Sequence, residues 1–86
     1  MILNGQVTVG TVATYIGQPS IEFMQTHIHN NDNTDIIYLG GPNVTTSNGL
    51  GLFKLDSFET VVGPNDQIFA VSAKNSHLVS YMMVSV

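Results

Sequence analysis

Short runs of apolar and β-branched residues alternate with clusters of Gly, Pro, Asn, Asp and Ser along the whole chain, and no segment repeats apolar residues at helical spacing. The runs predict β-strands and the clusters predict turns. The expected strands cover residues 6–10, 11–16, 20–29, 35–39, 50–55, 58–62, 67–73 and 77–86, with a short extended piece at 43–49. The sequence therefore predicts one all-β domain over residues 1–86, an antiparallel β-sandwich, jelly-roll-like fold or small barrel of about eight short strands.

The turns between these strands contain residue types with known backbone preferences. Residues 30–33, Asn-Asn-Asp-Asn, tolerate left-handed backbone angles and bond their own main chain. Asn48-Gly49 predicts a tight turn, and residues 63–66 fit a type I turn with Pro64 at its second position. Residues 74–76 are expected to join the last two strands as a hairpin loop.

Alternation within the strands predicts which side chains face the core. In the strand at 20–29, Met24 and Ile28 share the inner face, whereas His27 and His29 share the outer one. The expected core residues are Met24, Ile28, Ile37, Leu39, Phe69, Val71, Leu78, Met82 and Val84.

Three aromatic residues, Tyr38, Tyr81 and Phe53, are candidates for an interface. Tyrosine left on an outer face is typical of binding surfaces. The alternative for each tyrosine is a packed ring with only its hydroxyl in water, and the sequence leaves both open.

Composition favours a chain that assembles with other copies or partners. Eighty-six residues form a thin core, and domains of this size usually need a disulfide, a metal or a partner subunit. The chain has no Cys, 9% charged residues against about 25% in an ordinary domain, and a net charge of −4. We therefore expect a homo-oligomer, preferably a ring of three. A neutral polar surface that is merely tolerated in an extracellular or viral β-domain is the alternative explanation of the low charge.

The same composition argues against two kinds of partner. Phosphate binding needs clustered Lys and Arg, and the chain has two such residues in total. A membrane span needs about twenty apolar residues, and the longest apolar stretches, 36–39 and 81–84, have four each. We expect no nucleic-acid partner and no membrane insertion.

His27-Ile28-His29 is a metal-ligand pattern, because residues two apart on a strand project from one face and two imidazoles can chelate Zn²⁺, Ni²⁺ or Fe²⁺. A closed site needs further donors. The conceivable ones are His77, Asp32, Asp35 and Glu22. Nothing in the sequence brings them to the pair, so we expect no metal and no cofactor, with His27 and His29 as weak candidates. Residues 31–35 carry oxygen ligands but lack the glycine and distal Glu of a calcium loop.

No catalytic constellation is expected. The aspartates lie in predicted turns, where bonds to the backbone explain them. No serine lies in a G-x-S-x-G elbow. Gly40-Gly41-Pro42 has neither the Lys nor the following helix of a phosphate-binding loop. We therefore expect that the protein is not an enzyme.

The central part of the chain resembles a pattern found in small proteins of tailed-bacteriophage virions. Its parts are Ile28-His29-Asn30, a polar turn, Ile37-Tyr38-Leu39-Gly40-Gly41, and Val44-Thr45-Thr46-Ser47-Asn48-Gly49 before an apolar strand. Residues 9–14 and 68–73 resemble it too, so the likeness covers most of the chain. This chain departs from it at residues 50–55, where the family usually has a Gly-rich approach to the strand.

The resemblance implies a component of the phage virion, and we expect it on the capsid surface. A chain of this size best suits a capsid decoration (cement) protein, which binds the major capsid protein, often as a trimer, and stabilises the phage head. The alternative is a receptor- or glycan-binding module of a phage tail or fibre. In that case outward Tyr38, Tyr81 and Phe53 would stack on sugar rings.

Overall fold

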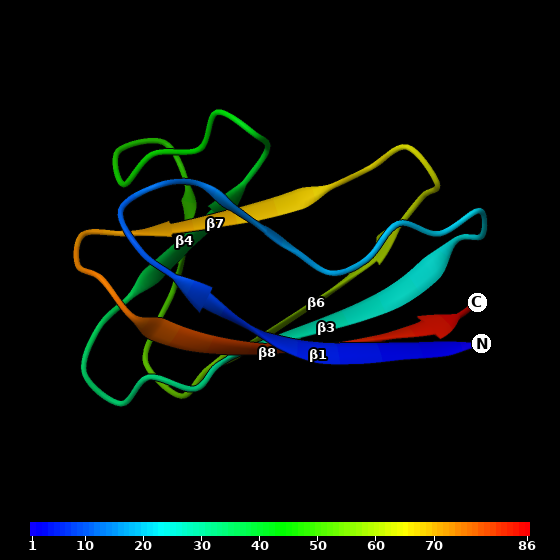
Figure 1. The fold of residues 1–86 in the computed structure, drawn as a ribbon, viewed down its shortest axis with the longest axis horizontal. Helices are drawn as coiled ribbons and strands as arrows, with labels where there is room; N and C mark the ends of the chain where they lie inside the picture. Colours follow the sequence, from blue (N-terminus) through cyan, green and yellow to red (C-terminus); the bar gives the residue numbers. More distant parts are fainter.

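The computed structural model describes all 86 residues and confirms the all-β fold class. Eight strands form two four-stranded antiparallel sheets, stacked as two layers (Figure 1). Sheet A has the order β1-β8-β3-β6 and sheet B has the order β2-β7-β4-β5. The strands are β1 (Ile2–Val9), β2 (Thr14–Ile16), β3 (Met24–Asn30), β4 (Ile37–Gly40), β5 (Leu50–Leu52), β6 (Ser57–Val62), β7 (Ile68–Ser72) and β8 (His77–Ser85).

The connections between strands give the sandwich a jelly-roll topology. Each connection crosses from one sheet to the other, except that between β4 and β5, which pair within sheet B. The two strand orders are those of an eight-stranded jelly roll, built from two Greek keys. The predicted hairpin of the last two strands is therefore wrong. β7 pairs with β2 and β4, whereas β8 pairs with β1 and β3. A short polar loop looks the same in sequence whether the chain turns back or crosses to the facing sheet.

Alternating side chains from both sheets meet in one core. In β3, Met24, Thr26 and Ile28 point inward and are fully buried, as the period of two predicts for Met24 and Ile28. Ile37 and Leu39 of β4 face them from sheet B. The buried apolar cluster comprises Val9, Ile16, Met24, Ile28, Ile37, Leu39, Leu52, Ala70, Val79, Tyr81 and Met83.

The prediction for the last strand is wrong in phase. β8 carries apolar residues on both faces, so alternation alone does not choose between them. The structure buries Val79, Tyr81 and Met83, and the expected core residues Leu78, Met82 and Val84 lie on the outer face. The strand begins at His77, which is itself buried, and every second residue after it follows to the inside.

The loop between β4 and β5 covers part of the outer face of sheet B. Val71 is buried as predicted, whereas Phe69 is half-buried, with its ring centroid 5.7 Å from that of Tyr15. Residues 43–49 form turns and not the extended piece expected from their sequence. Gly49 packs closely against Tyr38, since a Cβ at this position would lie 2.7 Å from the Tyr38 Cβ. Only glycine fits there.

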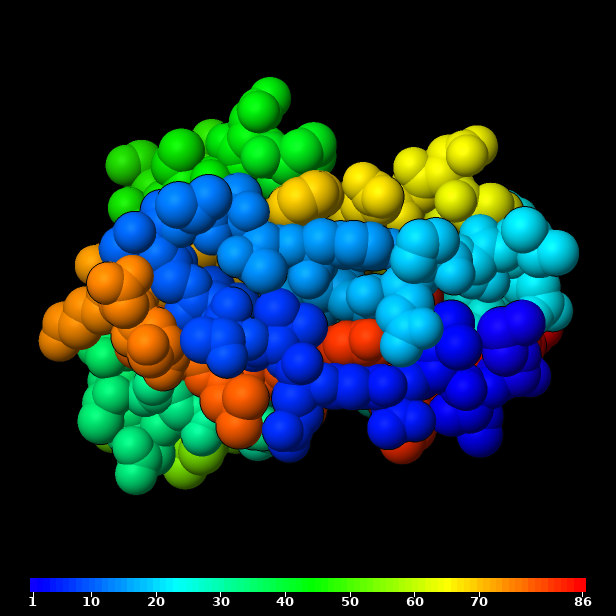
Figure 2. Space-filling view, in the orientation of Figure 1, coloured from blue at the N-terminus to red at the C-terminus, as the bar shows by residue number.

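Both chain ends lie at one end of the sandwich (Figure 1), where the Ser85 amide donates to the Met1 carbonyl oxygen over 3.0 Å. Figure 2 shows residues 10–22, in lighter blues, crossing the near side of the molecule between the two layers. The structure contains no helix that is long and apolar enough to cross a membrane.

The phase of β8 is tested by two neighbouring methionines. Met83 is 3% exposed and Met82 is 47% exposed. Met83→Ala is expected to lower the free energy of unfolding by about 2 to 5 kcal/mol, because it leaves a cavity in the core. Met82→Ala is expected to change it by about 0.5 kcal/mol or less. Urea denaturation of the two variants measures both values, and the reverse order would contradict the observed phase.

Candidate functional site

A buried amide organises the loop between β3 and β4. Asn30, the last residue of β3, is fully buried. Its Nδ2 donates to the carbonyl oxygens of Asp35 and Leu52 over 3.0 and 3.1 Å, and Phe53 O lies 3.3 Å away. Its Oδ1 accepts from the Asp32 amide over 3.0 Å. The amide therefore holds the loop against the end of β5.

Asp32 accepts hydrogen bonds on both of its carboxylate oxygens. Oδ1 accepts from the amide and hydroxyl of Thr34, over 2.7 and 2.6 Å, and from the Asp35 amide over 3.2 Å. Oδ2 accepts from His77 Nδ1 over 2.5 Å. The bonds from Thr34, followed by that from His77, hold the pKa of Asp32 well below its usual value. Asp32 is therefore an ionised acceptor.

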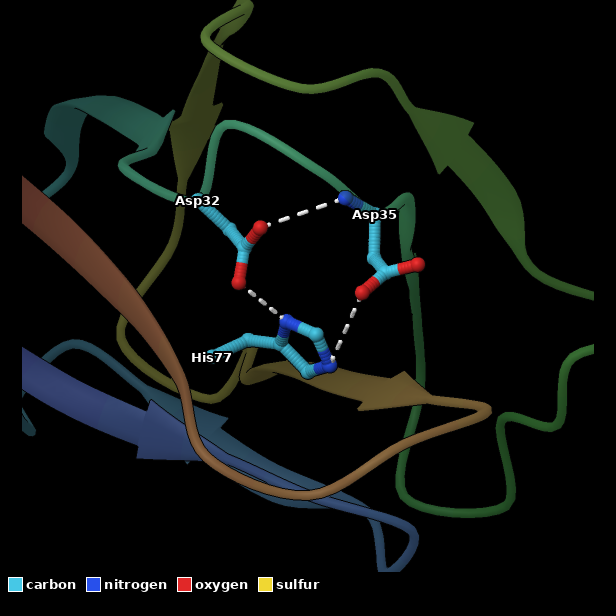
Figure 3. Close-up of side chains that lie close together, drawn as sticks. All are labelled: Asp32, Asp35 and His77. Atoms are coloured by element: carbon cyan, nitrogen blue, oxygen red, sulfur yellow. Dashed lines mark hydrogen bonds and ion pairs between the residues drawn. The ribbon is translucent and has the colours of Figure 1, made fainter.

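His77 brings the start of β8 into contact with this loop (Figure 3). Its side chain is 3% exposed. Nδ1 bonds Asp32, whereas Nε2 is buried and has no hydrogen-bond partner. Nε2 points toward Asp35 Oδ2, 4.0 Å away, which is beyond hydrogen-bonding distance (Figure 3).

Asp35 is the more open member of the cluster, with a side chain that is 27% exposed. Its Oδ1 lies 3.5 Å from Lys74 Nζ, which extends into solvent from the loop before β8. Its Oδ2 lies 3.0 Å from the Thr34 hydroxyl oxygen and faces His77. Asp35 and Lys74 also line a shallow depression of about 230 Å³ on the surface. The Asp35 carboxylate thus lies between the buried His77 ring and solvent.

Asp32, Asp35 and His77 form the one group of His, Asp and Glu side chains in the chain whose donor atoms gather closely enough to share a metal ion. These donor atoms lie within 4.8 Å of one another. All three are among the conceivable ligands expected from the sequence, but as further donors to the His27–His29 pair and not as ligands that gather with one another. Their contact depends on β8 crossing to sheet A, which no local pattern shows.

His27 and His29, the weak metal candidates, lie on the outer face of sheet A and do not join this group. His27 Nδ1 lies 3.2 Å from Glu59 Oε2, and His29 Nδ1 lies 2.9 Å from the Ser57 hydroxyl oxygen. Glu22, the fourth conceivable donor, accepts from Ser85 Oγ. Each histidine therefore has its own neighbour on β6.

The three interface candidates differ in exposure. Phe53 is 62% exposed and Tyr38 is half-buried. Tyr81 is 8% exposed, and its hydroxyl accepts from Gln18 Nε2 over 2.8 Å. Of the two alternatives that the sequence left open for Tyr81, the structure shows the packed ring and not the outward interface residue. Tyr81 belongs to the inward set of β8, and its hydroxyl finds a partner at the edge of the core.

One half of the outer face of sheet A is apolar. We call this set the apolar face, and it comprises Ile2, Phe23, Val61, Met82, Val84 and Val86. Strand pairing places Val84 beside Ile2 on one side and Gln25 on the other. The Val86 amide donates to Phe23 O, so these two residues extend the face toward the chain ends. Glu59 is the one acidic residue on the outward positions of this sheet. The sequence missed this face because it assigned Met82 and Val84 to the core.

The stabilising role of Asp32 depends on pH. Its folded-state pKa lies below the ordinary value of 3.8, so the ionised carboxylate stabilises the folded chain above about pH 4, and this contribution is lost as the pH falls further. Asp32→Asn is expected to lower the denaturation midpoint at neutral pH, and its difference from wild type is expected to shrink toward pH 2. Urea denaturation in EDTA at a series of pH values measures this difference.

Asp66→Asn serves as the matched control. The Asp66 carboxylate accepts a single bond, from the Gly63 amide over 3.1 Å, in an exposed turn. The difference in denaturation midpoint between Asp66→Asn and wild type is expected to stay small at every pH. An Asp32→Asn difference that does not change with pH would contradict the role assigned to the carboxylate.

Comparison with protein-family models, curated proteins and solved structures found no match to this chain. Two features of the molecule itself are candidates for binding, the apolar face of sheet A and the Asp32–Asp35–His77 cluster.

Proposed function

We propose that this domain is a structural virion protein and not an enzyme: a capsid decoration (cement) protein that binds the major capsid protein and stabilises the phage head. The observation that carries the proposal is the apolar face of sheet A. Jelly-roll domains occur among viral capsid proteins, lectins and cupins, and fold alone does not choose among these. The resemblance of residues 27–49 to phage virion proteins favours the first.

The apolar face has the composition of an interface core. Protein interfaces are depleted of charge at their centre, and burying an unpaired charge there is costly. The outward residues between Ile2 and Val61 are apolar or neutral. The one acidic side chain, Glu59, is paired, since it accepts from Gln25 Nε2 over 2.8 Å and lies 3.2 Å from His27 Nδ1. A stable contact buries about 800 Å² on each partner. The face can supply the apolar centre of such a contact, with Asn4 and Gln25 as hydrogen-bonding groups.

Self-association is part of the proposal. β1 and β6 form the two edges of sheet A, and each carries unpaired backbone groups on its outer side. A neighbouring copy can cover such an edge, and few charges oppose its approach. We propose a ring of three on the capsid surface, since a closed ring leaves no free edge of this kind.

The alternative, a receptor- or glycan-binding module of a tail or fibre, would require exposed aromatic rings. Of the three rings considered, Phe53 is exposed, Tyr38 is half-buried and Tyr81 is buried. One of these three rings is thus freely accessible for stacking, and the other exposed ring, Phe23, belongs to the six residues of the apolar face.

A charge within the apolar face is expected to weaken capsid binding. Met82→Asp should reduce rebinding to capsids stripped of the protein by about tenfold or more, since about 1.4 kcal/mol corresponds to a factor of ten. Val12→Asp is the matched control, because Val12 is an exposed apolar residue in the loop between β1 and β2. Co-sedimentation with capsids measures both. Equal binding of the two variants would contradict docking through this face.

Copy number separates the capsid function from the tail function. Purified virions are expected to contain hundreds of copies of the chain, because a decoration protein occupies the repeated symmetry axes of the head. Quantitative mass spectrometry against the major capsid protein gives the ratio. A dozen copies or fewer would reject the capsid function and favour the tail or fibre module.

A further inference from the structure

We propose that His77 Nε2 and Asp35 Oδ2 bind a divalent transition-metal ion of the Zn²⁺ class, with Asp32 orienting the imidazole. This site lies away from the apolar face, and the inference does not depend on the proposed function.

The first argument is the unpaired ring nitrogen. Asp32 accepts on both oxygens, so the proton of its bond to His77 is carried by Nδ1. In the neutral ring, Nε2 then holds the lone pair. This lone pair is buried, has no hydrogen-bond partner and points toward a second carboxylate (Figure 3). Buried polar atoms are almost always paired, and a lone pair facing an anion is stabilised by a cation between them.

The arrangement matches a recurring design of zinc sites. A metal-binding histidine commonly donates its other ring N–H to a carboxylate, which fixes the ring orientation and makes the free nitrogen a better ligand. Here Asp32 Oδ2 accepts from His77 Nδ1 over 2.5 Å. Bonds from the amide and hydroxyl of Thr34 hold the Asp32 carboxylate in place. The ring is therefore oriented before an ion arrives.

The distances fit an ion after a small adjustment. Zn–N and Zn–O bonds are each about 2.1 Å, so a tetrahedral ion separates its nitrogen and oxygen ligands by about 3.4 Å. The observed separation of Nε2 and Oδ2 is 4.0 Å. Closing the difference requires a shift of a partly exposed carboxylate on a loop. Asp35 can make this shift without disturbing the buried Asn30 network, which contacts its backbone and not its side chain.

The donor set selects the kind of ion. Imidazole nitrogen suits Zn²⁺, Ni²⁺ and Cu²⁺ better than Ca²⁺ or Mg²⁺, which prefer oxygen ligands throughout. Water reaching Asp35 through the adjoining depression can complete the coordination. Lys74, whose ammonium lies 3.5 Å from Asp35 Oδ1, opposes the ion by repulsion. The site is thus weak in the wild-type chain and becomes stronger when this charge is removed.

The test uses the full chain with the exposed histidines removed. His27 and His29 share a face and can bind transition metals themselves, so His27→Gln and His29→Gln form the background. Zn²⁺ is titrated by calorimetry into this EDTA-stripped and desalted protein, with ¹⁵N NMR of the His77 ring nitrogens as a direct report. We expect saturable binding of one ion per chain and a shift of the Nε2 resonance.

Two further substitutions in that background decide the outcome. Asp35→Asn is expected to weaken Zn²⁺ binding about tenfold or more, and Lys74→Gln is expected to strengthen it several-fold. If Asp35→Asn fails to fold, as judged by its melting temperature without metal, Lys74→Gln and the Nε2 resonance carry the decision. Absence of saturable binding up to millimolar Zn²⁺, an unmoved Nε2 resonance, or binding unchanged by both substitutions would overturn the proposal.

Discussion

A chain of hydrogen bonds runs from Asn30 through Asp32 to His77 and joins the end of β3, the following loop and the start of β8. Asn30 is fully buried, and its side chain has partners on both its oxygen and its nitrogen. Its amide therefore positions the Asp32 backbone. Asp32 in turn accepts from His77, and burial of that histidine sets which residues of β8 turn inward. This connection thus goes together with the observed phase of β8 in sheet A.

The phase of β8 decides the character of two surfaces at once. With His77 inside, Val79, Tyr81 and Met83 complete the core, and Met82 and Val84 are left on the outer face beside Ile2. A slip by one residue would exchange the two sets. Because both sets are apolar, the hydrophobic effect alone discriminates poorly between them. A specific polar contact makes the choice, and the apolar face is its consequence.

The two candidate sites lie at opposite ends of β8. His77 is its first residue, paired with Val9, whereas Val84 is near its last, paired with Ile2 beside the chain ends. An ion bound near His77 would tie the loop after β3 to sheet A, while a partner on the apolar face would cover the other end. Stability of the loop and attachment to a partner are thus separable properties of one small sandwich.

The sequence by itself determined the all-β class, the approximate number of strands and the inward faces of β3 and β4, although it missed residues 2–5 of β1. Apolar–polar alternation in a strand such as Met24–Asn30 has one arrangement that buries its apolar side chains. Only the tertiary structure decided the jelly-roll order, the phase of β8 and the meeting of Asp32 and Asp35 with His77. These depend on which sheet each connection reaches, and a loop such as residues 73–76 has the same composition in either case. Contacts between residues more than forty positions apart, such as Asp32 and His77, follow from that choice and from no local pattern.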